Sequence, residues 1–316
     1  MADQKIIAVI GATGAQGGSV ARAILNDPNH EFAVRAITRK PDSDKAKVLA
    51  AACAEVVAAD LDDVNSLTKA FTGAYGAYCV SNYWELFSAE KETAQAKNMA
   101  AAAKNAGVKH VISSTLEDTR KFIPLSDNRM PTLMGKYKVP HFDGKGEADA
   151  FFVEAGVSTT FLLIAFYWEN MIFFGAGPQK GPDGKYYISY PMGDKKMAGI
   201  GAEDIGPCAL SVFKKPGEFI GKRIGIAGDE LTISQMATTL SKVLGKDILY
   251  NSVTPETYRG FGFPGADDMG NMFQFYADFE EYLHGARDVA LSRRLNPKMQ
   301  SFEQWAQKNA ARIPLD

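Results

Sequence analysis

Three glycines near the start of the chain have the spacing of a phosphate-binding turn. The segment KIIAVIGATGAQGGSV at residues 5–20 places Gly11, Gly14 and Gly17 directly after an apolar run. Such a turn needs glycine because the backbone bends sharply, approaches a pyrophosphate without intervening Cβ atoms and packs the next helix closely on the strand. The anion then lies at the helix N-terminus, where free N–H groups and the helix dipole stabilise it. The segment predicts a dinucleotide-binding turn, and the alternative is an ordinary tight turn between strand and helix.

A basic residue stands where a dinucleotide site selects between NAD and NADP. Arg39 follows the predicted second strand, about 20 residues beyond the glycines, at the place where an NAD site usually has an acidic residue for the ribose 2′-hydroxyl. A carboxylate would repel a 2′-phosphate, whereas arginine binds it through charge-assisted hydrogen bonds. Arg39 therefore predicts NADP(H) rather than NAD(H). The alternative is a solvated basic strand end.

Polar and aromatic residues follow two further predicted strands. Asp60 and Leu61 come after the strand at 55–59, where Asp60 is placed to contact the adenine amino group and Leu61 to pack on the ring. The sequence SNYW at 81–84 follows the strand at 77–80 and is a candidate wall on the nicotinamide side. The alternative for these aromatic residues is packing back onto the core.

The candidate catalytic residues are His141 and Lys145, which lie one helical turn apart in the pattern H-x-x-x-K. Hydride-transferring short-chain enzymes need Tyr-x-x-x-Lys, in which the lysine orients the nicotinamide ribose and lowers the tyrosine pKa. Here His141 replaces the tyrosine. A nearby lysine favours the neutral imidazole, which is a poor proton donor but can still polarise a carbonyl. The pair weakens the case for a reductase without excluding one.

Alternating strands and helices must position these residues. Strands are predicted at 6–10, 32–38, 55–59, 77–80, 110–114 and 159–164, with helices between them. This alternation predicts an α/β fold with a doubly wound parallel sheet of the Rossmann type and a smaller C-terminal α+β domain. We expect the dinucleotide-binding domain over residues 1–165 with a return segment at about 196–230, and the smaller substrate or partner domain over 166–195 and 231–316.

Composition argues against several classes of function. The chain has 316 residues and a net charge of −2, so no global field would recruit nucleic acid or an anionic membrane. The N-terminus lacks an apolar signal segment and no apolar run reaches membrane-spanning length, so we expect a cytoplasmic protein, with nuclear entry left open. Cys53, Cys79 and Cys208 are far apart and form no C-x-x-C pair, which predicts buried reduced thiols and no metal site.

One stretch of the C-terminal half has two interpretations. Met269, Met272, Phe273, Tyr276 and Phe279 recur at helical spacing. They form either part of the core or a groove for a protein partner, because methionine-rich surfaces repack easily.

Motifs in both halves of the chain resemble the NmrA-like family of atypical short-chain reductases, most closely its NADPH-sensing members. The motifs are GATGAQGGSV, VRAITRKP, SNYWE, HFDGKGE, YWEN and GFPGA…NMFQFYA. The resemblance implies a Rossmann domain with a small C-terminal domain, NADP(H) in the cleft and a regulatory role. It also implies the nucleotide contacts Gly11, Ala12, Thr13, Gly14, Ala15, Gln16, Arg39, Asp60, Leu61, Ser81, Asn82, Tyr83, Lys145, Tyr167 and Asn170. Gly17 and Lys40, which neighbour these residues, are further candidates for cofactor binding. The chain departs from these members at Ala94 and Ser43, where they have basic residues, so phosphate binding is expected to be weaker.

Two hypotheses follow. The first is an NADP(H)-binding redox or nucleotide sensor, a monomer or homodimer, that acts on a regulatory protein partner with little or no dehydrogenase activity. The second is an NADPH-dependent reductase of a small carbonyl or quinone, whose pocket would be lined by Tyr83, Trp84, Phe166, Tyr167 and Trp168. The missing tyrosine favours the sensor.

Overall fold

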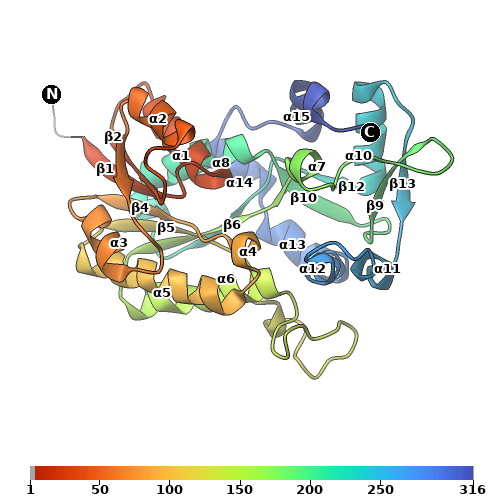
Figure 1. Cartoon of the computed structure of the whole chain (residues 1–316), viewed down its shortest axis with the longest axis horizontal. Helices are drawn as coiled ribbons and strands as arrows, with labels where there is room; N and C mark the ends of the chain where they lie inside the picture. The colour runs from red at the N-terminus through yellow and green to blue at the C-terminus, as the bar shows by residue number, and fades with distance from the viewer. Residues whose placement is uncertain (1–3, 316) are drawn as a thin grey trace. The chain divides into compact units, whose positions relative to one another are not determined.

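The computed structural model describes residues 4–315, and the chain divides into two compact units (Figure 1). The first unit comprises the chain up to Asp118, His141–Leu163 and Ala202–Ile224, and the second comprises Thr119–Pro140, Ile164–Gly201 and the chain from Gly225. Two parts of the predicted boundaries are wrong. Thr119–Pro140 belongs to the second unit, because Asn271 donates hydrogen bonds to the carbonyls of Pro131 and Lys138. The return segment is also shorter than predicted.

The first unit contains a seven-stranded sheet in the order β11-β6-β5-β4-β1-β2-β3. Every pairing from β3 across to β6 is parallel, which confirms the predicted doubly wound sheet. Residues of β1, β4 and β5 are buried in almost unbroken runs, as a sheet covered on both faces requires. The strands are β1 (Lys5–Ile10), β2 (Phe32–Thr38), β3 (Glu55–Ala58), β4 (Gly76–Cys79), β5 (His110–Thr115), β6 (Thr159–Ile164) and β11 (Arg223–Ile226).

Helices cover both faces of this sheet (Figure 1). One face is covered by α1 and α8, which pack so closely that a Cβ atom on Gly206 would lie 2.1 Å from the Ser19 carbonyl oxygen. The other face carries α3, α5 and α6, whose apolar residues form a core with β1, β4 and β5. The helices of this unit are α1 (Ala15–Leu25), α2 (Asp44–Ala51), α3 (Val64–Phe71), α4 (Tyr83–Leu86), α5 (Ala89–Asn105), α6 (Pro140–Glu154), α8 (Ala202–Phe213) and α9 (Pro216–Phe219).

One helix is absent from the predicted elements of this unit, and one local prediction needs correction. After β4, Tyr83–Leu86 forms α4, a helix of four residues that is too short to give a periodic pattern. Cys79 and Cys208 are buried as predicted, whereas Cys53 is exposed. Cys53 follows the C-terminus of α2 in the left-handed region, with φ of 71°, and so faces outward at a turn.

The second unit is built from two three-stranded sheets and shorter helices. One sheet has the order β12-β10-β7 and the other β13-β9-β8. The strands are β7 (Phe166–Tyr167), β8 (Gln179–Lys180), β9 (Tyr186–Tyr190), β10 (Lys196–Ile200), β12 (Asp229–Thr232) and β13 (Ile248–Ser252). The helices are α7 (Asn170–Phe173), α10 (Ile233–Leu244), α11 (Pro255–Arg259), α12 (Ala266–Asp278), α13 (Glu280–Ala286), α14 (Val289–Leu295) and α15 (Phe302–Asn309), with short 3₁₀ turns at Thr119–Lys121 and Ala310–Arg312.

The methionine and aromatic residues of α12 belong to the core of this second unit. Met272, Phe273 and Tyr276 are buried, and the Phe273 ring lies 4.8 Å from that of Tyr190 between centroids. The core interpretation is therefore confirmed for these side chains. Between residues 4 and 315, no helix has both the length and the apolar character needed to cross a membrane.

Candidate functional site

The sheet order of the first unit brings most of the candidate site residues to one edge. β4 and β2 flank β1 on opposite sides, so the order of the strands along the chain reverses beside β1. In open α/β sheets, ligands bind at such a switch point, beyond the carboxyl ends of the strands. The loops at these ends carry the glycine turn after β1, Arg39 and Lys40 after β2, Asp60 and Leu61 after β3, and Ser81 and Asn82 after β4.

The glycine turn has the geometry that a dinucleotide requires. Gly11 has φ of 62°, in the left-handed region, and its carbonyl accepts a 2.8 Å hydrogen bond from Gly14 N–H. A Cβ atom on Gly17 would lie 2.3 Å from the Ile10 carbonyl oxygen, so only glycine allows α1 to pack this closely on β1. α1 begins at Ala15 without a side-chain cap, which leaves its first N–H groups available to an anion. The close packing of the turn and the uncapped start of α1 leave room and N–H donors for a pyrophosphate.

Gln16 is held by the sheet beneath it. Its Oε1 accepts a 2.6 Å hydrogen bond from the buried hydroxyl of Tyr78 on β4. The first turn of α1 is therefore tied to the strand on the far side of the switch point. Ala12 and Thr13 lie in the turn that precedes this helix.

Arg39, the predicted 2′-phosphate contact, forms a bidentate ion pair with Glu85 of α4. Its Nη1 lies 2.7 Å from Glu85 Oε1, and its Nη2 donates a 2.9 Å hydrogen bond to Oε2. Both side chains remain accessible, with 59% and 41% of their surfaces exposed. The hydrogen bond from Arg39 to Glu85 is the main reason that the pKa of Arg39 is raised above its usual value. Lys40 is exposed beside it.

The turn after β3 is fixed by hydrogen bonds to α3 and α5. Asp60 N–H donates to Ser66 Oγ at 3.2 Å, and Asp60 Oδ1 accepts from Asp62 N–H at 3.0 Å. The Leu61 carbonyl accepts a 2.9 Å hydrogen bond from Asn98 of α5. Asp60 and Leu61 are thus held at the sheet edge where the sequence places them.

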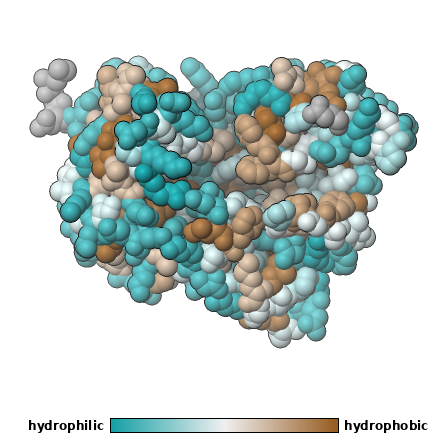
Figure 2. Space-filling model, viewed as in Figure 1, coloured by the Kyte–Doolittle hydropathy of each residue, from teal (hydrophilic) through white to brown (hydrophobic). Residues whose placement is uncertain are grey.

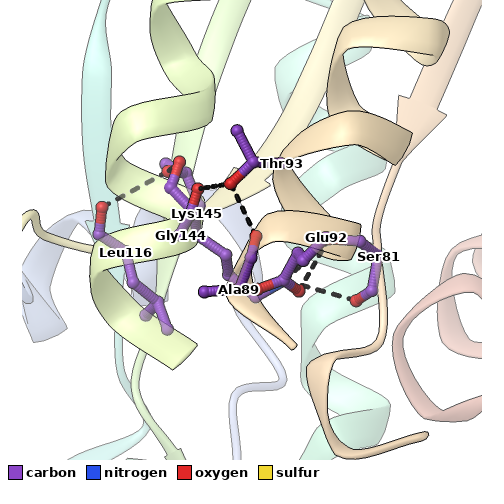
Figure 3. A network of polar contacts seen from close by, with 8 residues as sticks. Ser81, Ala89, Glu92, Thr93, Leu116, Gly144 and Lys145 are labelled. Atoms are coloured by element: carbon purple, nitrogen blue, oxygen red, sulfur yellow. Dashed lines mark hydrogen bonds and ion pairs between the residues drawn. The ribbon is translucent and has the colours of Figure 1, made fainter. Parts of the chain in front are cut away.

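Lys145 lies in a buried polar network with Ser81 and Glu92 (Figure 3). Its Nζ lies 2.6 Å from Glu92 Oε1, 3.0 Å from Ser81 Oγ and 3.2 Å from the Ser81 carbonyl oxygen. Lysine has three N–H donors, so the protein itself supplies an acceptor for each of them. The Glu92 side chain is only 2% exposed, so this is a buried ion pair.

Two glycines beside Lys145 allow this placement. A Cβ atom on Gly144 would lie 3.0 Å from Ala89 Cβ of α5, and one on Gly146 would lie 2.4 Å from Asp118 N. Thr93 joins α5 to α6 as well, because its hydroxyl contacts the carbonyls of Ala89 and Gly144 (Figure 3). Gly144 therefore lets α6 approach α5 closely enough for Lys145 to reach Glu92, and Gly146 lets α6 approach the backbone that follows β5.

His141 lies among aromatic rings and is 6% exposed. Ring centroids of Phe142, Trp84 and Tyr83 lie 4.7, 4.8 and 5.8 Å from its own. Tyr83 is only 3% exposed, so it packs onto the core rather than forming an open wall. Trp84 is half-buried and is the ring of this tetrad that keeps access to solvent.

The remaining candidate residues lie in the second unit. Tyr167 is in β7, opposite Ile200 of β10, and Asn170 begins α7. Phe166 and Trp168, which were expected to line a substrate pocket, are 5% and 2% exposed and belong to the core of this unit. The Phe166 ring packs against Tyr190 and Phe273, and the Trp168 ring packs against Phe302 and Trp305, so both are covered by side chains of the same unit.

Sequence reasoning missed both carboxylates that pair with the basic residues of the site. Glu92 had a detectable signal, because it falls on the buried face of α5 with Ala89, Ala96 and Met99. An acidic residue on an apolar helix stripe needs a buried partner. Glu85 had no such signal, since α4 is a single turn.

The two departures from the NADPH-sensing pattern have simple structural settings. Ser43 is the N-cap of α2, where its Oγ accepts a hydrogen bond from Ala46 N–H at 3.4 Å. Ala94 is exposed on α5. The chain uses position 43 to begin a helix rather than to carry a charge.

The fold and this sheet edge define a dinucleotide-binding protein of the short-chain reductase type. Residues 3–306 match the NmrA-like family, and the chain belongs to that family. It is 32% identical to the NmrA-like family domain-containing oxidoreductase FrzB of Cladobotryum sp over 289 residues, which cover 85% of this chain and 83% of its relative.

Solved structures share the fold. NmrA, a negative transcriptional regulator crystallised in complex with NADP, superposes with a TM-score of 0.77 at 23% identity, over 96% of this chain and 95% of NmrA. The triphenylmethane reductase of Citrobacter sp., crystallised with NADP(H), superposes with a TM-score of 0.72 at 20% identity, over 97% of this chain and 99% of the reductase. At these identities the likeness establishes the fold alone.

Proposed function

We propose that this chain binds NADP(H) and acts as a nucleotide sensor that regulates a protein partner, with little or no hydride transfer. The dinucleotide would be held by the turn at Gly11–Gly17, with Arg39 at the 2′-phosphate and Asp60 and Leu61 at the adenine. NADP or NADP(H) is present in structures that share the fold, including that of a transcriptional regulator. When bound, the nicotinamide would supply redox chemistry, and the residues around it decide whether that chemistry is used.

The observation that carries this proposal is the buried pair of Lys145 and Glu92. A reductase of the short-chain type needs a lysine that contacts the nicotinamide ribose and a tyrosine that donates a proton. Here the acceptors for all three lysine protons are protein atoms, and His141 stands in place of the tyrosine. The tyrosine of the usual proton-donating pair is therefore replaced, and its lysine is engaged by protein atoms.

A sensor also needs two conformations with different nucleotide affinities. Hydrogen exchange of the chain alone, with NADPH and with NADP⁺ measures this directly. We expect slower exchange at the glycine turn with either nucleotide and a difference between the two nucleotides around α4. Equal hydrogen exchange with NADPH and NADP⁺ would show that the chain does not sense the redox state of the nucleotide. The chain could then respond only to whether a nucleotide is bound.

The second candidate function is an NADPH-dependent reductase of a small carbonyl or quinone. FrzB and several other relatives are named oxidoreductases, and the half-buried Trp84 beside His141 offers an apolar contact for such a substrate. Nicotinamide absorbance followed with NADPH and a panel of quinones and carbonyls separates the two functions. Saturable NADPH binding without turnover supports the sensor. Turnover that is lost in His141→Ala, but kept in the matched exposed variant Glu90→Gln, would make the chain an enzyme.

A further inference from the structure

Arg39, which forms an ion pair with Glu85, is also the residue expected to bind the 2′-phosphate of NADP(H). A bidentate contact between guanidinium and carboxylate has the geometry that guanidinium also uses for phosphate. The two carboxylate oxygens of Glu85 lie 2.7 and 2.9 Å from the two Nη atoms of Arg39. Two oxygens of a 2′-phosphate would bind the same two nitrogens. The Glu85 carboxylate and a 2′-phosphate therefore cannot bind these nitrogens of Arg39 at the same time.

We propose that Glu85 determines the cofactor specificity of this chain, because its carboxylate occupies Arg39 and a 2′-phosphate binds only by displacing it. This inference rests on the proposed NADP(H) function and adds a residue that limits it. NAD(H) has no 2′-phosphate, so it leaves the pair intact. Glu85 therefore lowers the preference for NADP(H) that Arg39 alone would give.

Other carboxylates lie near Arg39, but they have other partners. Asp62 is 2.7 Å from Lys91 Nζ and accepts a 3.1 Å hydrogen bond from Gln95, and these two contacts lower its pKa. Asp60 accepts from the Asp62 backbone. Both carboxylates act on Arg39 only through their charge, whereas Glu85 contacts it directly. A phosphate thus competes with Glu85 for the Nη atoms of Arg39, whereas Asp60 and Asp62 act against it only through their negative charge.

Displacement of Glu85 also acts on α4. This helix lies between two fixed points: Ser81, which is bonded to Lys145, and Ser88, which caps α5. Its C-cap is Phe87, a non-glycine residue in the left-handed region with φ of 49°. Apolar surface lies over the α4 region beside hydrophilic surface (Figure 2), and Leu86 and Phe87 are 50% and 40% exposed.

Trp84 can report such a change. It precedes Glu85 in α4 and lies against His141, with 4.8 Å between ring centroids. The other two tryptophans, Trp168 and Trp305, are buried in the second unit. A probe that carries the 2′-phosphate but no nicotinamide should therefore change tryptophan fluorescence mainly through Trp84.

The test compares the full-length wild type with Glu85→Gln by calorimetric titration with NADP⁺, NAD⁺, 2′,5′-ADP and ADP. Glutamine keeps the shape of the side chain but removes its charge, so phosphate no longer competes with a carboxylate. We expect NADP⁺ and 2′,5′-ADP to bind about tenfold more tightly to the variant, and NAD⁺ and ADP to change by less than about twofold. Adding Arg39→Ala should erase the gain.

Glu303→Gln provides the matched control. Glu303 lies 2.7 Å from Lys242 and is 45% exposed, close to the 41% of Glu85, and it belongs to the second unit. This variant should leave all four affinities unchanged. In the wild type, 2′,5′-ADP should change tryptophan fluorescence, and Trp84→Phe should remove that change.

The alternative outcomes are distinct. If NADP⁺ and NAD⁺ both bind and Glu85→Gln alters neither, or alters both equally, Glu85 does not determine specificity and the inference is wrong. If neither nucleotide binds to the wild type or to any variant, the proposed function fails and the inference fails with it.

Discussion

Two ion pairs of the first unit involve basic residues that the sequence assigns to nucleotide binding, but they differ in burial. Glu92 is 2% exposed and holds Lys145 inside the protein, whereas Glu85 and Arg39 are 41% and 59% exposed. Breaking a buried pair leaves an uncompensated charge in a region of low dielectric constant, which is strongly destabilising. An exposed pair contributes little to stability and exchanges readily with solvent. Lys145 is therefore held in place by the fold, whereas Arg39 is available for exchange with a ligand.

The buried pair of Lys145 and Glu92 should dominate the stability of the first unit. Glu92→Gln removes the charge that compensates Lys145, so we expect the free energy of unfolding to fall by about 3 to 5 kcal/mol. Calorimetry should show a lower melting temperature for the transition of the first unit. The matched control is Glu90→Gln, an exposed position on the same helix, which should change stability by less than about 0.5 kcal/mol. Equal effects at the two positions would mean that the Lys145–Glu92 pair does not stabilise the fold.

His110 is another buried titratable group of the first unit. Its Nε2 lies 2.9 Å from Thr160 Oγ1, and the Thr160 hydroxyl donates to the Phe219 carbonyl, so the imidazole carries its proton on Nε2. Nδ1 is buried without a hydrogen-bond partner. Burial lowers the pKa of His110 from 6.5 to about 4.

This shift predicts a loss of stability in acid. Between pH 6.5 and about 4 the unfolded chain binds a proton at this imidazole that the folded chain does not, so stability falls as the pH falls through that window. We expect a loss of about 3 kcal/mol from this group. His110→Gln keeps a donor toward Thr160 but does not titrate, so its loss between pH 7 and 4 should be smaller by that amount. Identical pH dependence in both proteins would contradict the assignment.

The glycine turn after β1 links stability to nucleotide binding. Gly17→Ala would place a Cβ atom 2.3 Å from the Ile10 carbonyl oxygen and 2.4 Å from that of Gly11, so α1 must move away from β1. We expect a loss of about 1 to 3 kcal/mol and weaker binding of both NAD⁺ and NADP⁺. Gly217→Ala is the matched control, because nothing lies within 4 Å of its added Cβ. Unchanged nucleotide affinity in Gly17→Ala would show that the glycine turn is not part of the nucleotide-binding site.

The parts of the fold that could be predicted from sequence are those whose causes are local. The apolar runs of β1, β2 and β6 and the Thr232–Gln235 capping box are contained in a few consecutive residues, and the structure has all of them. The sequence assigns Thr119–Pro140 to the wrong unit, because its position depends on hydrogen bonds from Asn271, which lies 133 residues beyond Lys138. Local patterns carry no information about such partners.

The candidate site divides in the same way. The glycine turn, Arg39 and the pair His141 and Lys145 are motifs with fixed spacing, so sequence reasoning found them. Glu92 lies 53 residues from Lys145, and Glu85 lies 46 residues from Arg39. The sequence thus predicted each cation but not the carboxylate that pairs with it, and the carboxylates are what separate a lysine held by the fold from an exchangeable arginine.

The exposed pair of Arg39 and Glu85 should contribute little to stability. Glu85→Gln should lower the free energy of unfolding by less than about 1 kcal/mol, because both side chains are accessible to water and salt. Calorimetry of this variant beside Glu303→Gln should give melting temperatures close to the wild type for both. The small cost is what allows a 2′-phosphate to replace Glu85 without unfolding the sheet edge. A loss as large as that expected for Glu92→Gln would instead make Glu85 a structural residue, and nucleotide exchange at Arg39 would then require the first unit to open.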